Sequence, residues 1–364
     1  MTNRLHGLDI LRLLMALLVL LFHFGFRGAA NGDMPVLDIP LWLAEASRYG
    51  YLGVSGFFMI SGFVIAYSAE GRTALEFAIA RFARIYPTFL LCMTVTFLFE
   101  SWAGTPKIFA SFTDYLANIA LVSPALGHPF MDGAYWSIVL EVIFYGWVFV
   151  LMLTGLFQSQ KLPILIIWLL ISVLNQSLFH FRILEVLFIT KYSGFFIAGI
   201  VMYELRKNSS PAKWGVFLLS MMLALYTSYQ ELVGLENEFQ IALSTWLLTL
   251  IVLLLPVVLF AFLSFKVPVR FVFLASFAGG LSYPLYLVHQ HIGYVIFYHL
   301  GQGNLQTLMI VMVGLFILAS IIYLLFDRHA VTWVRTILMG WLVQGLLYRR
   351  LARHDKTNAV LAAE

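Results

Sequence analysis

The chain has 364 residues, of which 62% are hydrophobic and 11% are charged, and its formal net charge at pH 7 is +4. Because soluble domains carry about 25% charged residues, this composition excludes an ordinary water-soluble protein and predicts a polytopic membrane protein. The single cysteine excludes an intramolecular disulfide framework and a cysteine-based metal cluster. The positive charge lies in short connecting loops and in the tail, so it indicates no nucleic-acid partner, and we expect no metal.

Apolar stretches recur along the whole chain. A membrane-spanning helix needs roughly 20 mainly apolar residues. Two shorter stretches, 73–87 and 110–123, are typical of interfacial or re-entrant helices. We therefore predict an all-α fold of about ten transmembrane helices with short interfacial helices, the spans being 8–26, 50–68, 86–103, 134–157, 161–179, 184–205, 213–229, 239–263, 280–300 and 305–326.

The distribution of basic residues predicts the orientation of these spans. An even number of spans puts both termini on the same side of the membrane. Most of the 22 lysines and arginines then fall in loops on that side, whereas the opposite loops hold only Arg27, Arg48, Lys107 and Arg182. By the positive-inside rule, both termini are predicted to be cytoplasmic.

The first span carries two ionisable side chains, Arg12 and His23. They are eleven residues apart, which places them on one helix face and about 16 Å apart along the axis. Ionisable groups are unfavourable by several kcal/mol in the hydrocarbon region, so they mark candidate functional positions. The alternative is that Arg12 extends to the interface and that His23 is a hydrogen-bonded packing residue.

The second and third spans add a small-residue segment and an arginine pair. "GVSGFFMISGFVIAYS" contains Ser61 among glycines, which permits close helix packing or the passage of a slender ligand. "ARFARIYP" places Arg81 and Arg84 on one face of a short helix that is predicted to stop before Pro87. Two guanidinium groups so arranged can bind a phosphate, or they can contact lipid headgroups.

The fourth span contains an acidic residue, Glu141, in "YWSIVLEVIFY". It is predicted to lie about 10 Å below the non-cytoplasmic surface, and His23 lies a few residues below the same surface. We therefore expect Glu141 to contact His23, fix its tautomer and raise its basicity. A structural ion pair is the alternative.

Two later spans contain further candidates. Lys191 in "FITKYSGFF" is an intramembrane cation that could contact a phosphate or a carboxylate. In "LSYPLYLVHQHIGYVIFYHL", Tyr283 and His289 lie near a helix break expected at Pro284, as in a helix that lines a wet cavity. His289 is a candidate either for orienting other groups or for taking part in the chemistry.

The chain end differs from the rest. Residues 1–330 are predicted to form the transmembrane domain, and 331–364 a cytoplasmic amphipathic helix on the membrane followed by a disordered tail from 355. An eleventh span is the alternative, but it would export the three arginines between 349 and 353.

Five stretches together resemble the acyltransferase-3 family of bacterial integral-membrane acyltransferases, whose members modify envelope and exported glycans and some small molecules. The resemblance covers most of residues 5–330. It rests on the Arg12 to His23 spacing and on "GVSGFFMISGFVIAYS", "FARIYP", "YWSIVLEVIFY" and "LSYPLYLVHQHI" in this order. The chain departs from the family at the end of the last helix, where an acidic residue often comes shortly before a proline: "LLFDRHAV" supplies Asp327 but has Ala330 where a proline is expected.

The resemblance implies an O-acyltransferase of the inner, or plasma, membrane that uses cytoplasmic acyl-CoA, most often acetyl-CoA, to modify a hydroxyl of a cell-envelope or exported glycan. We expect the CoA phosphates near Arg12, Arg81 and Arg84, and the pantetheine arm beside Ser61. His23, oriented by Glu141, would act as general base. Tyr283 or His289 would stabilise the oxyanion, and a covalent acyl-histidine remains an alternative to direct transfer.

A second function remains open from the sequence. In a proton-coupled transporter or permease of a lipid-linked glycan or anionic metabolite, His23 and Glu141 would form a proton relay and the arginines would bind the substrate. The expected partners are membrane lipid and a glycan or lipid-linked sugar. The sequence leaves open the acceptor, the acyl group and the oligomeric state.

Overall fold

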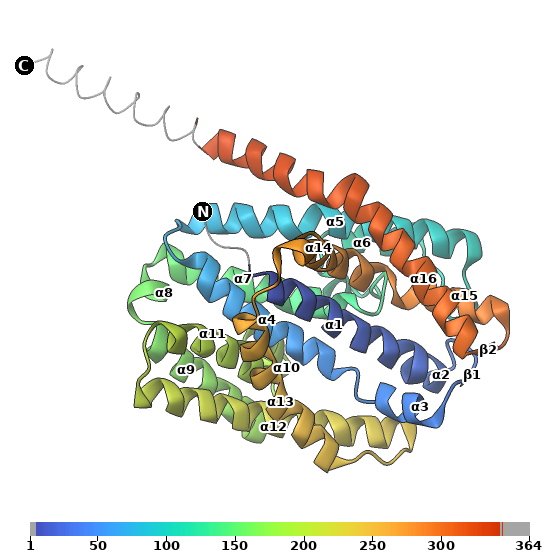
Figure 1. Ribbon diagram of the computed structural model, residues 1–364, viewed down its shortest axis with the longest axis horizontal. Helices are drawn as coiled ribbons and strands as arrows, with labels where there is room; N and C mark the ends of the chain where they lie inside the picture. The colour runs from blue at the N-terminus through green and yellow to red at the C-terminus, as the bar shows by residue number, and fades with distance from the viewer. Residues whose placement is uncertain (1–4, 343, 345–364) are drawn as a thin grey trace, which may run out of the picture.

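The computed structural model describes residues 5–342 and 344 and shows a bundle in which most helices lie side by side (Figure 1). Its regular structure is almost entirely helical, which confirms the all-α fold. In the described part of the chain, nine helices are long and apolar enough to cross a membrane. The protein is therefore a multi-pass membrane protein.

The first half of the chain holds α1 to α8 and β1. Their bounds are α1 His6–Phe22, a π-helical turn His23–Arg27, α2 Gly28–Ala30, β1 Leu37–Asp38, α3 Leu41–Ser47, α4 Leu52–Ala69, α5 Ala74–Ala103, α6 Phe112–Ile119, a 3-10 turn Ser123–Leu126, α7 Tyr135–Leu153 and α8 Leu156–Ser159.

The second half holds α9 to α16 and β2. Their bounds are α9 Lys161–Leu174, a π-helical turn Asn175–Phe179, α10 Arg182–Leu187, α11 Ser193–Lys207, α12 Pro211–Phe239, α13 Thr245–Ser264, a 3-10 turn Val269–Phe271, α14 Val272–Val288, α15 Gln290–Leu300, β2 Gly303–Asn304, α16 Leu305–Ile322 and a π-helical turn Tyr323–Asp327.

The predicted span 184–205 is wrong in its extent, because the chain divides there into α10 and α11. α11 has 15 residues and a length of about 22 Å, which is less than the roughly 30 Å of a bilayer core. α11 still crosses the bundle, because its two ends pair with opposite ends of α12. Lys191, just before α11, pairs with Glu231 near the end of α12, and Glu204 near the end of α11 pairs with Lys213 near the start of α12. α11 packs between α4 and α12, and most of it is buried. A helix enclosed by protein need not match the lipid thickness.

Two helix interruptions expected at prolines do not occur there. α5 continues through Pro87, so the predicted stop before this residue is wrong. α14 likewise continues through Pro284, and the irregularity falls at His289. Membrane helices tolerate proline where neighbouring groups satisfy the backbone. The hydroxyl of Tyr283 makes a separate contact with the backbone of α5, donating to the carbonyl oxygen of Ile85 over 3.1 Å.

The last helix extends beyond the bundle (Figure 1). An apolar helical segment runs from Leu305 to Leu342, 38 residues in all. Its length of about 57 Å exceeds the bilayer core. The location of 331–342 on the membrane surface stays a prediction, and the predicted tail from 355 lies outside the described residues.

The bundle has two faces, which we call terminal and opposite. At the terminal face, the start of α1 and the π-helical turn Tyr323–Asp327 line one cavity, and Lys161 Nζ lies 2.5 Å from Glu204 Oε1. At the opposite face, Arg27 Nη2 lies 3.2 Å from Glu238 Oε1, and β1 pairs with β2 in parallel. Successive helices connect these faces alternately, and each predicted site residue can be assigned a depth between them.

Candidate active site

Three cavities follow one another from the terminal to the opposite face. The terminal cavity has a volume of about 490 Å³, the central cavity about 140 Å³ and the histidine cavity, which contains His23, about 860 Å³. Arg12 and Arg84 line both the terminal and the central cavity. Val54 and Tyr286 line both the central and the histidine cavity. The cavities therefore form a series across the bundle that narrows in the middle.

His23 begins the π-helical turn at the end of α1 and lines the histidine cavity. Its Nδ1 atom lies 2.8 Å from the hydroxyl oxygen of Tyr294 on α15. Because this bond occupies one ring nitrogen, Nε2 is the nitrogen left to a substrate. If Nδ1 carries the proton and donates it to Tyr294, Nε2 has a free lone pair and can act as a base.

His289 lies beside His23, and the centroids of the two rings are 5.1 Å apart. Its Nδ1–H donates to the carbonyl oxygen of Tyr286 over 2.7 Å. A carbonyl oxygen can only accept, so the neutral ring has its lone pair on Nε2. This Nε2 atom is buried and has no hydrogen-bond partner among the described residues. Neutral His289 is thus an acceptor, which disfavours the expected role as oxyanion donor.

The expected contact between Glu141 and His23 is wrong. Glu141 Oε1 instead accepts hydrogen bonds from Ser61 Oγ (2.9 Å) and from the hydroxyl of Tyr145 (2.5 Å), and Glu141 lines the central cavity. It lies about 9 Å into α7 from the start of that helix at Tyr135, deeper than the turn that holds His23. The structure therefore groups Glu141 and Ser61, whereas His23 lies in the next cavity.

The three predicted arginines do converge, since all of them line the central cavity. Arg84 Nη1 donates to Asp327 Oδ2 over 3.0 Å, and Arg12 Nη1 lies 3.5 Å from Asp9 Oδ1. Asp327, which is 1% exposed, also accepts from Thr88, the two oxygens being 2.5 Å apart.

Arg81 differs from the other two arginines. The guanidinium carbon of Arg81 lies 5.8 Å from the ring centroid of Phe77 and 5.9 Å from that of Tyr145. Its Nε atom has no hydrogen-bond partner within the described structure. The guanidinium is therefore positioned by rings rather than by an acid. It keeps donors available to a ligand.

Tyr283 and Lys191 lie in different cavities. Tyr283 lines the central cavity, where the Arg84 guanidinium carbon is 5.7 Å from its ring centroid, and its hydroxyl proton is used by Ile85. It does not line the histidine cavity, which disfavours the expected oxyanion role. Lys191 lines the histidine cavity, with its Nζ 3.2 Å from Glu231 Oε1. Lys191 is thus grouped with His23 and not with the arginines.

The residues that the sequence did not single out include Tyr294 and the partners of His291, a histidine near the break expected at Pro284, in a buried network at the opposite face. His291 Nδ1 lies 2.8 Å from Glu100 Oε1. The backbone N–H of His291 donates to Asp132 over 3.0 Å. The N–H of Gly133 donates to His291 Nε2 over 3.2 Å. These bonds fasten the segment before α7 to α15. Glu100 was recognisable as an acid inside an apolar span, whereas one tyrosine among 17 carries no such signal.

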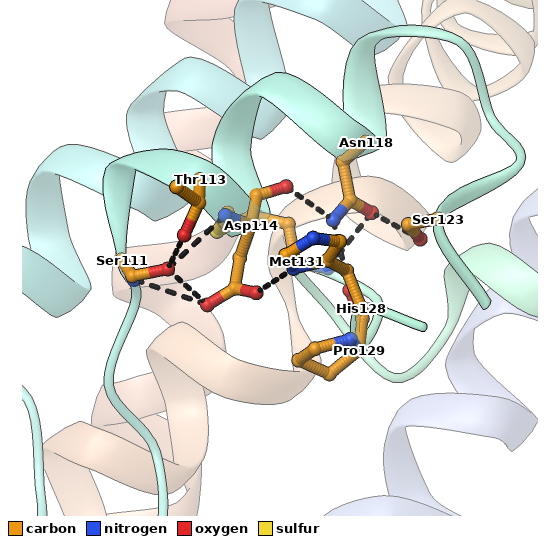
Figure 2. Close-up of polar contacts among 8 residues, drawn as sticks. All are labelled: Ser111, Thr113, Asp114, Asn118, Ser123, His128, Pro129 and Met131. Atoms are coloured by element: carbon orange, nitrogen blue, oxygen red, sulfur yellow. Dashed lines mark hydrogen bonds and ion pairs between the residues drawn. The ribbon is translucent and has the colours of Figure 1, made fainter. Parts of the chain in front are cut away.

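Residues 112–131, which we call the strap, cover part of the histidine cavity and are held by a second polar cluster (Figure 2). Ser111 caps α6 and donates to Asp114, and His128 Nδ1 lies 2.8 Å from Asp114 Oδ1. The hydrogen bond from Ser111, followed by that from His128, holds the pKa of Asp114 below its ordinary value. Asn118 donates to the carbonyl oxygens of Asp114 (2.8 Å) and Pro129 (2.9 Å). Several residues of the strap line the histidine cavity.

The described residues contain no group of three or more His, Cys, Asp or Glu side chains that could hold a metal ion. A family model described as an acyltransferase domain matches residues 5–353. No curated protein and no solved structure matches the chain. The match covers nearly the whole chain and favours acyl transfer over the transporter alternative. The chain therefore belongs to the acyltransferase-3 family and is a membrane acyltransferase.

Proposed function

We propose that this protein is an O-acyltransferase of the inner, or plasma, membrane. It transfers an acyl group, most simply acetyl, from cytoplasmic acyl-CoA to a hydroxyl of a cell-envelope or exported glycan. The observation that carries the proposal is the series of three cavities, which joins an arginine-lined end to a histidine-lined end. A donor made on one side of the membrane can thereby serve an acceptor on the other.

The arginine-lined end suits the phosphates of the donor. Guanidinium groups bind phosphate oxygens through paired, charge-assisted hydrogen bonds. Arg12 and Arg84 are each positioned by an acid, Asp9 and Asp327, and they extend from the terminal to the central cavity. The central cavity, at about 140 Å³, is narrow, so we assign the nucleotide to the terminal cavity and the pantetheine arm to the passage beside Ser61. The distance of about 16 Å from Arg12 to His23 is similar to the length of that arm.

The histidine-lined end suits the chemical step. His23 Nε2 removes the proton of the acceptor hydroxyl, whose oxygen attacks the thioester carbonyl carbon. The new C–O bond forms, the C–S bond breaks, and the CoA thiolate takes the proton from the His23 imidazolium. Tyr294 accepts the Nδ1 proton of His23 in a hydrogen bond and so fixes the tautomer.

Acyl transfer tests this proposal. Membranes that contain the wild type, His23→Ala or the control His329→Ala, at matched protein levels, are given radiolabelled acetyl-CoA, and label in the glycan fraction is measured. His329 is exposed near the terminal face. We expect the control to label like the wild type and His23→Ala to label at least about 100-fold more slowly. Full labelling by His23→Ala would contradict the mechanism, and no labelling by the wild type with any of several acyl-CoAs would contradict the function.

A further inference from the structure

The histidine cavity has an aromatic and polar wall that the mechanism above does not use. Trp136 and Tyr192 both line the cavity. Their ring centroids are 5.4 Å apart and the planes are inclined by 31°. The hydroxyl of Tyr192 donates to Glu231 Oε1 over 3.0 Å, and Lys191 Nζ lies 3.2 Å from the same oxygen. The wall thus combines ring faces with a carboxylate whose charge is balanced by a lysine.

Tyr51 is the unusual member of this wall. It lines the cavity and is only 8% exposed, yet its buried hydroxyl has no hydrogen-bond partner in the described part of the chain. A buried hydroxyl without a partner is unfavourable, so native structures rarely keep one unless a ligand or water completes it. The centroid of the Tyr51 ring is 5.6 Å from that of Phe22, the residue before His23. Tyr51 and the proposed base, His23, therefore line the same cavity.

We propose that Tyr51, Trp136 and Glu231 form an acceptor subsite that holds a sugar ring, an inference that rests on the proposed function and assigns residues to the binding of its acceptor. A sugar ring has apolar C–H faces that pack on aromatic rings and a rim of hydroxyl groups that donate and accept hydrogen bonds. Trp136 supplies the aromatic surface. Tyr51 supplies a free hydroxyl, and Glu231 supplies acceptor oxygens.

Charge and size support a sugar over a phosphate at this wall. The Lys191 ammonium is already paired with Glu231, so the wall carries little net charge for a phosphate to neutralise. The cavity volume of about 860 Å³ falls within the roughly 300–1,000 Å³ of small-molecule sites, which leaves room for a sugar and for the thioester end of the donor. The exposed Arg182 also lines this cavity, and the test therefore includes a phosphate arm.

The test compares Tyr51→Phe with a matched control. Tyr51→Phe removes only the hydroxyl, and the control Tyr298→Phe makes the same change at an exposed tyrosine outside the cavity. Purified protein in detergent is titrated with methyl glycosides of glucose, N-acetylglucosamine, mannose and rhamnose, and thermal unfolding is followed. We expect at least one glycoside to stabilise the wild type and the control. Tyr51→Phe should need a concentration of this glycoside about 2- to 10-fold higher for the same stabilisation, because the variant has lost one hydrogen bond to it.

A kinetic arm separates this inference from the proposed function. In the acyl-transfer assay, Tyr51→Phe should raise the KM for the glycan acceptor about 2- to 10-fold and leave the KM for acyl-CoA unchanged. Glycoside binding that depends on Tyr51, without any acyl transfer, would support the subsite and overturn the proposed function. Acyl transfer with the same acceptor KM in Tyr51→Phe and the wild type would overturn the subsite alone.

Two further outcomes are decisive. If inorganic phosphate stabilises the wild type and no glycoside does, the sugar assignment is overturned in favour of an anion held by Arg182 and Lys191. If Tyr51→Phe does not fold, Trp136→Phe takes its place, because it keeps an aromatic ring but reduces the stacking surface. A glycoside affinity that is unchanged in Trp136→Phe would then overturn the proposal.

Discussion

The two ends of the cavity series differ in how their polar groups are held. At the terminal end, Arg84 and Arg12 are positioned by the carboxylates of Asp327 and Asp9. At the histidine end, His23 and His289 are held by a hydroxyl and a carbonyl oxygen, both neutral. Acids beside the arginines keep these cations in place when no anion is bound. Neutral partners beside the histidines leave them free to take and return a proton.

This contrast assigns different kinetic roles to the two ends. Changes at the terminal end should alter the KM for the donor, because they act on binding. Changes at the histidine end should alter kcat, because they act on proton transfer. The following variants test this division.

The largest effect among them is expected for Asp327→Ala. The substitution removes the acceptor of both Arg84 and Thr88 and leaves the guanidinium without its positioning acid. Because hydrogen bonds to charged groups contribute about 1.5–3 kcal/mol, kcat/KM for acyl-CoA should fall about 10- to 100-fold, mainly through KM. Asp327→Asn, which keeps an oxygen acceptor, is the control and should lose less. A fall in kcat at an unchanged donor KM would contradict the assignment of this end to binding.

Glu141→Gln should also act on the donor. Glu141 holds Ser61 and Tyr145 in the central cavity, so the variant loosens the passage for the pantetheine arm. We expect the KM for acyl-CoA to rise about 10-fold, with the pH profile of kcat unchanged. If Glu141 instead oriented His23, as expected from the position of Glu141 along its span, Glu141→Gln would lower kcat and shift the pH profile of kcat.

Tyr294→Phe is the counterpart at the histidine end. It removes the hydroxyl that lies 2.8 Å from His23 Nδ1 and so frees the ring to adopt the wrong tautomer or orientation. We expect kcat to fall about 5- to 10-fold with the donor KM unchanged and the pH profile shifted. Tyr298→Phe, at an exposed position, should match the wild type. A changed donor KM with a normal pH profile would make Tyr294 a structural residue only.

Apolar stretches predicted most of the spans, and helical spacing predicted that Arg81 and Arg84 share a face, whereas their grouping with Arg12 came from the family resemblance. The spacing of Arg81 and Arg84 fixes their common face, and the common face is what brings both to the central cavity. The failure at Pro87 has the opposite origin. Local preference predicts a helix end before proline, but tertiary contacts in the bundle keep α5 continuous.

The predicted contact between His23 and Glu141 is wrong, because the position of a residue along its own span does not fix which side chains of other helices it meets. Glu141 lies deeper in the bundle than His23 and lines the central cavity, whereas His23 lines the histidine cavity. The residue that contacts His23 is Tyr294, 271 positions away in sequence. Only the packing of α15 against the end of α1 brings them together. The sequence likewise predicted for Lys191 a contact with a phosphate or a carboxylate but not its place, which is the histidine cavity beside Glu231.

The smallest effect is expected at the strap over the histidine cavity. Ser111→Ala removes the cap of α6 and the main cause of the lowered pKa of Asp114, at a cost of about 1 kcal/mol to the local structure. The loss of local stability is measured as amide hydrogen exchange of residues 112–131, corrected for the intrinsic exchange rate at each pH. At pH 7 the variant should exchange about 5-fold faster than the wild type. Thr113→Ala, on the exposed side of the same hydrogen-bond cluster, is the control.

The sign of the pH dependence follows from the direction of the Asp114 shift. A carboxyl group whose pKa is lower in the folded state stabilises that state above its ordinary value, here 3.8, and loses the contribution as pH falls through the folded pKa. The wild-type strap should therefore lose protection as the pH falls below about 4. Ser111→Ala should begin to open at a higher pH than the wild type, because its Asp114 has lost its main donor. Equal opening curves for both proteins would show that the Ser111 hydroxyl does not hold this wall of the cavity.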